Sequence, residues 1–145
     1  MNRVKGRRKE MTARAGSEAN NLAIYLREIS HIPMLSRDEE IRTAREAAAG
    51  SKGAREKLVS ANLRFVVHAA KKYQGLGLPL EDLINEGNVG LLNAVDRFDV
   101  DKGYHIVSCV ELQIFTYIIN CISRYRGRVL NHHGRHCLSG DDLVR

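Results

Sequence analysis

Apolar residues recur with the spacing of an α-helix along most of this chain, and no segment shows the alternation of a β-strand. One set, at positions i, i+3, i+4 and i+7, comprises Leu22, Tyr25, Leu26 and Ile29. Another set, with members four residues apart, comprises Ile106, Val110, Ile114, Ile118 and Ile122. Such spacings place apolar side chains on one side of a helix. The pattern predicts an all-α fold, a compact helical domain of about five helices.

Helix start and stop signals divide this pattern. Ser36 has an acidic residue three positions later, which is the signature of a capping box, and the helix that it opens ends at Gly50. Ser51 can cap a longer helix, and Pro79 suits the first position of the next one. A turn over residues 98–103 precedes the last helix.

The two ends of the chain lack this periodicity. Residues 1–16 are basic and are expected to form a disordered arm. Residues 127–145 are rich in Gly, His and Arg and are expected to form an irregular tail. The sequence therefore predicts one helical domain over residues 17–126, and the 145-residue length agrees with a single domain.

The net charge of +6 is concentrated at the ends. Residues 1–15 carry six basic side chains and one acid, and residues 121–145 carry five Arg and two Asp. The segment between them has 12 basic and 14 acidic residues, so the predicted domain is slightly acidic. Basic ends alone are weak evidence for nucleic-acid binding, because solvated tails have the same composition. Three Cys, all within the last 37 residues, form no disulfide framework and indicate a reducing, cytoplasmic location.

No arrangement of residues typical of catalysis is present. The chain lacks a recognisable nucleophile–base set, a paired-carboxylate motif and a glycine-rich phosphate loop, so we expect no enzyme, no catalytic residue and no cofactor. The strongest metal candidates are His132, His133, His136 and Cys137, with Cys121. Their spacing matches no standard zinc site, and we predict no metal. No uninterrupted apolar stretch approaches the roughly 18 residues of a membrane span.

The helix expected after Pro79 carries an unusual density of polar side chains on one side. These are Asp82, Asn85, Glu86 and Asn88. A solvated helix face is the ordinary explanation of such a group. Gly87 and Gly90 favour a second explanation, in which another helix or a partner lies close to this helix. Glycines that weaken a helix often permit such a close approach.

Several segments resemble bacterial RNA polymerase sigma factors. The runs that carry the resemblance are LVSANLRFVV at 58–67, AKKY at 70–73, GLPLEDLINEGNVGL at 77–91, and FD with KGY within 98–104. Upstream, YLREI at 25–29 is similar to the segment that precedes this domain in the primary and stationary-phase types. The resemblance covers about residues 20–104, and it implies a sigma factor truncated after the core-binding part of the conserved domain.

The resemblance implies that the helix pair over 58–97 docks on a coiled coil of the largest subunit of core RNA polymerase. The implied polymerase-binding residues are Asp82, Asn85, Glu86, Asn88, Leu83 and Leu91. An acidic and amide-rich surface facing basic partner side chains would supply charge-assisted hydrogen bonds and orientation.

The resemblance also implies contacts with promoter DNA, mainly with the non-template single strand of the minus-ten element. Asn62, Arg64 and Phe65 match positions that line pockets for flipped bases. Lys102 and Tyr104 match a turn that approaches the melted strand, and Arg27 would lie near DNA just downstream. An anti-sigma protein is a further partner that this resemblance allows.

After Tyr104 the sequence departs from the family. Cys109 stands where the family has a base-capturing Tyr, Leu112 and Gln113 stand where it has a Trp pair, and Phe115 and Thr116 stand where it has Arg-Gln. Stacking of a base on an aromatic side chain contributes on the order of 1–3 kcal/mol, which a thiol or a Leu does not supply. Promoter melting is therefore expected to be impaired.

Two accounts of the residues after Tyr104 stay open. In one, they form a diverged helix that keeps its apolar stripe, and in the other they are out of frame or decayed. The function expected from the resemblance is that of an initiation factor that binds core polymerase and helps to recognise the minus-ten element. The alternatives are a non-initiating regulator that occupies the sigma site, a basic helical DNA-binding protein, and a non-functional remnant.

Overall fold

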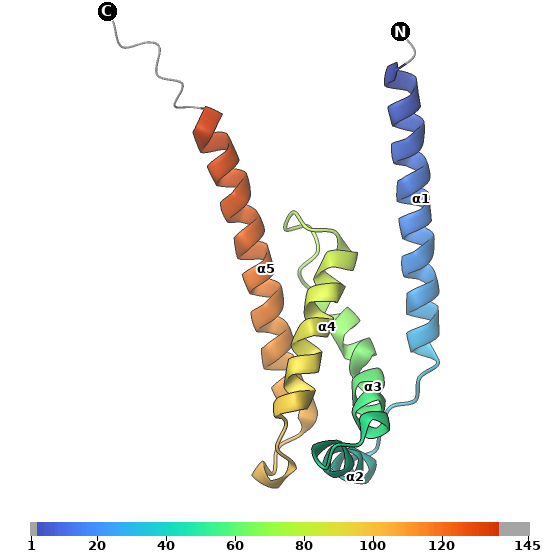
Figure 1. Ribbon diagram of the computed structural model, residues 1–145, viewed down its shortest axis with the longest axis vertical. Coiled ribbons are helices and arrows are strands. Elements are labelled where there is room, and N and C mark those ends of the chain that lie inside the picture. Colours follow the sequence, from blue (N-terminus) through green and yellow to red (C-terminus); the bar gives the residue numbers. More distant parts are fainter. Residues whose placement is uncertain (1–2, 137–145) are drawn as a thin grey trace, which may run out of the picture.

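A computed structural model describes residues 3–136, and the described chain consists of five α-helices and one short 3-10 helix (Figure 1). The helices are α1 (Arg3–Ser30), α2 (Arg37–Ala48), α3 (Lys52–Lys71), α4 (Leu80–Arg97) and α5 (Ile106–His136), and the 3-10 helix η1 spans Val100–Lys102. No strand occurs among these residues. The predicted all-α fold of about five helices is confirmed.

The α3–α4 pair forms the centre of the molecule. In Figure 1, α5 lies on one side of this pair, α1 lies on the other side, and the short α2 crosses the base. The two long helices α1 and α5 run in opposite directions along the chain, so the start of α1 and the end of α5 lie at the same end of the described structure (Figure 1). Helix α4 packs mainly against α5 and α3, and this packing sets which of its faces remains exposed.

The predicted helix caps are present. The Ser36 hydroxyl accepts a bond from the backbone N–H of Glu39 at 3.4 Å, and the Glu39 carboxylate accepts one from the backbone N–H of Ser36 at 3.1 Å. These bonds stabilise the charged carboxylate, and the backbone N–H of Ser36 contributes most to lowering the pKa of Glu39. The Ser51 hydroxyl caps α3 by accepting from the N–H of Ala54 at 3.3 Å.

The core lies where α3, α4 and α5 meet. Its largest fully buried side chains from α3 and α4 are Leu58, Val66, Leu83 and Leu91. The stripe predicted for α5 is buried along its whole length, and its members are Ile106, Val110, Ile114, Ile118 and Ile122. This burial agrees with the account in which the residues after Tyr104 form a diverged but packed helix.

Two glycines of α4 allow the central helices to approach closely. A Cβ atom on Gly90 would lie 2.9 Å from the carbonyl oxygen of Gln113 and 3.0 Å from the Cα of Ile114, both in the backbone of α5. A Cβ on Gly87 would lie 2.7 Å from Cγ1 of Val66 in α3. Close helix approach, one of the two explanations offered for this pair of glycines, is therefore what the structure shows.

The structure differs from the expectation at both ends of the chain. The backbone of residues 3–16, predicted as a disordered arm, belongs to α1, and that of residues 127–136, predicted as an irregular tail, belongs to α5. Both segments continue a packed helix, so they add hydrogen bonds without a new nucleation cost. The first segment is also rich in Arg, Lys and Ala, which favour helix without any apolar periodicity. Residues 137–145 lie outside the described chain.

Helix α5 contains one stretch, Ile106–Arg128, that is long and apolar enough to cross a membrane by length and composition alone. No such stretch was expected from the sequence, because polar residues interrupt the apolar run. Within this stretch, the five residues of the stripe from Ile106 to Ile122 are buried in the core, whereas Val107, Leu112 and Phe115 are exposed.

Candidate functional site

The exposed face of α4 carries the polar group that the sequence analysis singled out, here called the α4 ridge (Asp82, Asn85, Glu86 and Asn88). Asp82 and Asn85 are exposed, whereas Glu86 and Asn88 are half-buried. Further along the helix, the same face shows the apolar side chains of Val89 and Leu92, which are 43% and 36% exposed. A partner that lies along α4 would therefore meet polar groups first and then a small apolar patch.

Leu83 and Leu91, which were included among the polymerase-binding residues, lie in the core. Both have 0% exposure, because they sit on the side of α4 that faces α3 and α5. In this structure they cannot touch a partner, so the prediction of direct contact is corrected. Their role is to hold α4 so that its opposite side carries the ridge.

One side of the α4 ridge faces α5. Nη2 of Arg124 lies 3.5 Å from Oε2 of Glu86, and 65% and 31% of these two side chains remain exposed. The thiol of Cys121 lies beside the same carboxylate. Burial, followed by the negative charge of Glu86, raises the pKa of Cys121, so the thiol stays protonated at neutral pH. Helix α5 thus places a cation against one member of the ridge.

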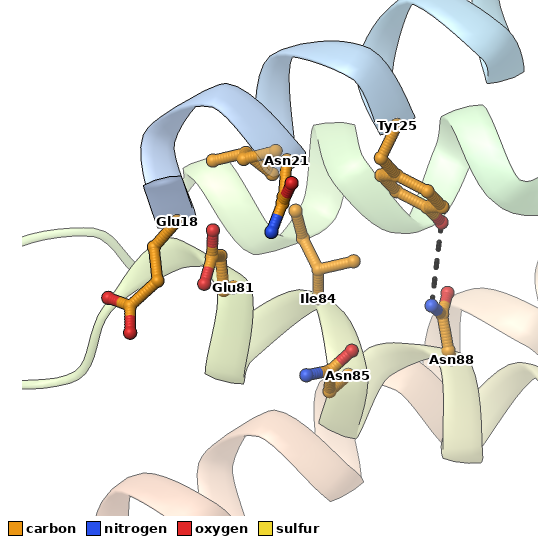
Figure 2. Close-up of a pocket in the computed structure, with 8 residues that line it drawn as sticks. Glu18, Asn21, Tyr25, Glu81, Ile84, Asn85 and Asn88 are labelled. Carbon is orange, nitrogen blue, oxygen red and sulfur yellow. Dashed lines mark hydrogen bonds between the residues drawn. The ribbon is translucent and has the colours of Figure 1, made fainter. Parts of the chain in front are cut away.

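The other side of the ridge faces α1 across a cleft. Asn85 and Asn88 line this cleft together with Tyr25 of α1 (Figure 2). Nδ2 of Asn88 donates to the Tyr25 hydroxyl at 3.5 Å, while Oδ1 of Asn88 is buried without a hydrogen-bond partner among the described residues. The ridge is therefore divided between two neighbouring helices, which the sequence pattern did not show.

The first group of candidate DNA-binding residues lies where α3 passes the end of α1. Nη2 of Arg64 donates to the carbonyl oxygens of Ser30 at 3.0 Å and Ile32 at 2.7 Å, so this guanidinium closes off the end of α1. Arg27 is exposed in the last turn of the same helix. The structure thus brings Arg64 and Arg27 to one end of α1.

Asn62 and Phe65, the other members of this group, are less accessible. Asn62 is only 8% exposed, and its Nδ2 donates to the carbonyl of Leu58 at 2.8 Å. Phe65 is half-buried against the core. A base could reach these two side chains only at their exposed edges.

Lys102, the last residue of η1, and Tyr104, which lies between η1 and α5, form a second group. Both are exposed, and the ring of Tyr104 packs edge-on against Phe98 with 6.0 Å between centroids. Gly103 between them has φ +79°, a conformation that favours glycine. The turn thus presents a cation and an aromatic ring side by side.

A buried carboxylate that sequence reasoning missed holds this turn in place. Glu40 of α2 is 8% exposed, and its Oε1 accepts from the first backbone N–H of α5, that of Ile106, at 3.1 Å. The same oxygen pairs with Nη1 of Arg37 at 2.6 Å, and Nη2 of Arg37 donates to the carbonyl of Tyr104 at 3.3 Å. The only signal for Glu40 in the sequence is its position as the third of three consecutive acidic residues after Ser36.

The outer face of α5 has the composition that set the sequence apart from the family. Leu112 is 64% exposed and Phe115 is 48% exposed, whereas Cys109 and Gln113 are half-buried. The ring of Phe115 lies 6.0 Å from that of Tyr73 at the end of α3. This face mixes apolar and polar side chains, because Ser108, Glu111 and Thr116 are also exposed, and Phe115 is its one aromatic side chain among those named.

No group of three or more His, Cys, Asp or Glu side chains that could hold a metal ion occurs among the residues whose side chains are described. Of the metal candidates from the sequence, Cys137 lies outside the described residues. His132, His133 and His136 fall on the last turns of α5.

Comparison with known proteins gives two family matches in the same order as the helices. Residues 21–52 match the family described as Sigma-70 factor, region 1.2, and residues 58–108 match Sigma-70 region 2. The first match covers the end of α1 and all of α2, and the second covers most of α3, all of α4 and the beginning of α5. The second match ends at residue 108, four residues after Tyr104.

Individual relatives agree with these matches. The chain is 43% identical over 106 residues to the RNA polymerase sigma-C factor of Myxococcus xanthus, which is 73% of this chain and 36% of that protein. It is 51% identical over 81 residues to RNA polymerase sigma factor SigA of Clostridium acetobutylicum, 56% of this chain and 21% of that protein. It is 48% identical over 81 residues to RNA polymerase sigma factor RpoS of Coxiella burnetii, 56% of this chain and 23% of that protein.

These matches define the class of protein: an all-α domain with the helices of Sigma-70 regions 1.2 and 2 in family order. The chain belongs to the sigma-70 family of RNA polymerase sigma factors, which confirms the resemblance seen in the sequence. It spans about a third or less of the length of these relatives.

Proposed function

We propose that this chain acts as a sigma-type transcription initiation factor that binds core RNA polymerase through the α4 ridge and contributes to recognition of the promoter minus-ten element. The observation that carries the proposal is the exposed position of Asp82 and Asn85 on a helix whose other side is fully packed. Both residues fall within the stretch that matches Sigma-70 region 2.

Rigid packing supports a binding role for the ridge. A polar group on a helix that is fixed by a buried core loses little conformational freedom when a partner binds. Leu83 and Leu91 supply this support from the inner side of α4. Carboxylates and amides in this position fit a basic partner surface, such as the coiled coil of the largest polymerase subunit, through charge-assisted hydrogen bonds.

The two groups of candidate DNA-binding residues support the second part of the proposal. Arg27 is exposed near Arg64 at one end of α1, and Lys102 is exposed beside Tyr104 on the turn before α5. Cations next to an exposed ring suit a single strand, because they can contact phosphates while a base stacks on the ring. On this proposal the protein works in the cytoplasm, without enzymatic activity of its own.

A pull-down with bacterial core RNA polymerase tests the docking. The unchanged chain is expected to be retained, and Asp82→Lys is expected to remove most of the binding by placing a cation in the ridge. Asp38→Lys is the matched control, because Asp38 is an exposed acid on α2, away from α4. Absence of binding by the unchanged chain, or equal binding by both variants, contradicts the proposal.

A second candidate function is that of a regulator that occupies the sigma site on polymerase without opening promoters. The observation that favours it is the outer face of α5, where Leu112 and Phe115 are exposed in place of the family's Trp pair and Arg-Gln. Without wide aromatic rings at this edge, an unpaired base loses the stacking energy that keeps the strands apart.

Footprinting of single-stranded DNA on a minus-ten promoter with core polymerase separates the two candidates. An initiation factor gives reactive unpaired bases in the minus-ten element, whereas the regulator gives none and suppresses opening by another sigma factor. Strand opening with this chain therefore excludes the regulator.

A further inference from the structure

A cleft between α1 and α4 adjoins the α4 ridge (Figure 2). Its walls come from the second half of α1 and the first half of α4, and Leu22 and Ile84 form its apolar floor. The polar residues that line it are Glu18, Asn21 and Tyr25 from α1, and Glu81, Asn85 and Asn88 from α4. Asn85 and Asn88 belong both to this cleft and to the ridge, so the two surfaces are continuous.

Among the residues whose side chains are described, the lining is rich in hydrogen-bond acceptors and has no cation. Glu18 and Glu81 lie toward the same end of the cleft in Figure 2, and neither carboxylate forms an ion pair with a described side chain. At the other end, Oδ1 of Asn88 is buried and receives no hydrogen bond from the described residues. This oxygen lies below the surface, so the acceptors that a ligand can reach are the side-chain oxygens of Glu18, Glu81 and Asn85, and they favour a ligand that brings N–H groups.

The chemistry of the lining favours a basic side chain over other occupants. The ammonium of Lys or the guanidinium of Arg donates several hydrogen bonds and is attracted by two carboxylates. Its aliphatic stem can pack on the apolar floor formed by Leu22 and Ile84. The chain's own basic segment near residues 3–9 does not fold back into the cleft, because it continues the straight run of α1 (Figure 1).

We propose that the α1–α4 cleft receives an Arg or Lys side chain of the polymerase segment that docks on the α4 ridge. The inference rests on the proposed function and extends it, since it adds α1 to a docking surface otherwise confined to α4. A partner segment that crosses α4 would then be held on both sides of Asn85: by the ridge toward α5 and by the cleft toward α1.

The affinity of the full chain for core polymerase, measured by titration at two salt concentrations, tests this inference. Removing both charges with Glu18→Gln and Glu81→Gln is expected to weaken binding by about tenfold and to reduce its salt dependence. Asn21→Asp, which adds a carboxylate at an exposed position of the lining, is expected to strengthen it. Glu28→Gln is the matched control on α1, because Glu28 is exposed and does not line the cleft.

The outcomes separate this inference from the proposed function. If the unchanged chain does not bind polymerase, the proposed function fails. Suppose that the unchanged chain binds polymerase and that the Asp82→Lys variant does not. If the cleft variants then bind as well as the Glu28→Gln variant, only the inference is overturned. A change in oligomeric state with the cleft variants, seen by sedimentation, also overturns it, because a second copy of the chain would then be the occupant.

Discussion

Helices α4 and α5 pack against one another and share the core, yet their outer faces differ. The inner side of α4 buries Leu83 and Leu91, and the inner side of α5 buries an unbroken stripe from Ile106 to Ile122. Outside, α4 carries the polar ridge, which lies within the stretch that matches Sigma-70 region 2, whereas α5 exposes Leu112 and Phe115, which lie beyond that stretch.

This difference shows that the buried face of a helix and its exposed face can change independently of each other. A buried stripe is constrained by volume and by contact with its neighbours, so it survives only as apolar residues of suitable size. An exposed face is free of that constraint and can change its chemistry at little cost in stability. Helix α5 therefore supports the fold without supplying the aromatic surface that resemblance to the family implies.

The largest expected effect comes from forcing the two helices apart. Gly90→Val places side-chain atoms against the α5 backbone, where a Cβ alone would lie 2.9 Å from the carbonyl oxygen of Gln113. Because backbone atoms cannot rotate away, the free energy of unfolding is expected to fall by about 3 kcal/mol. Chemical denaturation measures it.

Gly53→Val is the matched control for this change. Gly53 lies in the first turn of α3, and nothing lies within 4 Å of a Cβ built there. Its effect is expected to stay within about 0.5 kcal/mol. Equal effects at the two glycines would show that α4 and α5 do not pack as described.

The second prediction concerns the attachment of α5 to α2. Glu40→Ala removes the acceptor for the N–H of Ile106 and the partner of Arg37, and is expected to cost about 2 kcal/mol in the free energy of unfolding. Glu40→Gln keeps an acceptor and is expected to cost less. Glu46→Ala, on the exposed side of α2, serves as the control, and an equal loss there would argue against a specific role for Glu40.

A smaller effect is expected where α5 meets the ridge. Arg124→Ala frees the carboxylate of Glu86, and the affinity for core polymerase is expected to rise about twofold to threefold, because exposed ion pairs contribute under about 1 kcal/mol. Arg126→Ala removes the same charge from the same helix, and Arg126 forms no ion pair with a described residue. An unchanged affinity for Arg124→Ala relative to Arg126→Ala would show that α5 does not compete for the ridge.

The smallest effect concerns the end of α4. Arg55 pairs with Asp96 through two bonds, of 2.6 and 3.0 Å, and the hydrogen bonds from Arg55 lower the pKa of Asp96. A lowered pKa in the folded state stabilises the protein above the ordinary Asp value of 3.8, and this contribution is lost as the pH falls through the folded value. Because both side chains are substantially exposed, Asp96→Asn is expected to cost only about 0.5 kcal/mol at pH 7.

Denaturation of wild type and Asp96→Asn at pH 7 and near pH 2 measures this contribution. The difference between the two proteins is expected to vanish at the lower pH. A difference that persists at low pH would mean that the carboxylate is not the source of the effect.

Much of the fold could be predicted because its determinants are local. The capping box at Ser36 and the stripe of α5 each depend on residues within one helix, and the structure contains both. The close approach at Gly90 joins two helices, but the glycine itself is a local signal that allows it. The extent of the terminal helices could not be predicted from apolar periodicity, because a helix that has already formed continues through residues of high propensity.

The candidate site was predicted less completely, because its contacts join distant parts of the chain. Glu40 meets Ile106 across 66 positions, and Arg64 meets the carbonyl of Ile32 across 32. A sequence pattern gives no orientation for such contacts. For the same reason Leu83, grouped with the ridge in the sequence, is in the core, while the cleft between α1 and α4 had no sequence signal.

Competition for core RNA polymerase tests the central claim most directly. The labelled chain is bound to core polymerase and an unlabelled full-length sigma factor is titrated in. If the α4 ridge occupies the sigma site, the full-length factor displaces the chain completely, and the Asp82→Lys variant requires far less competitor or does not bind at all. A stable complex that holds both proteins on one polymerase would contradict the account.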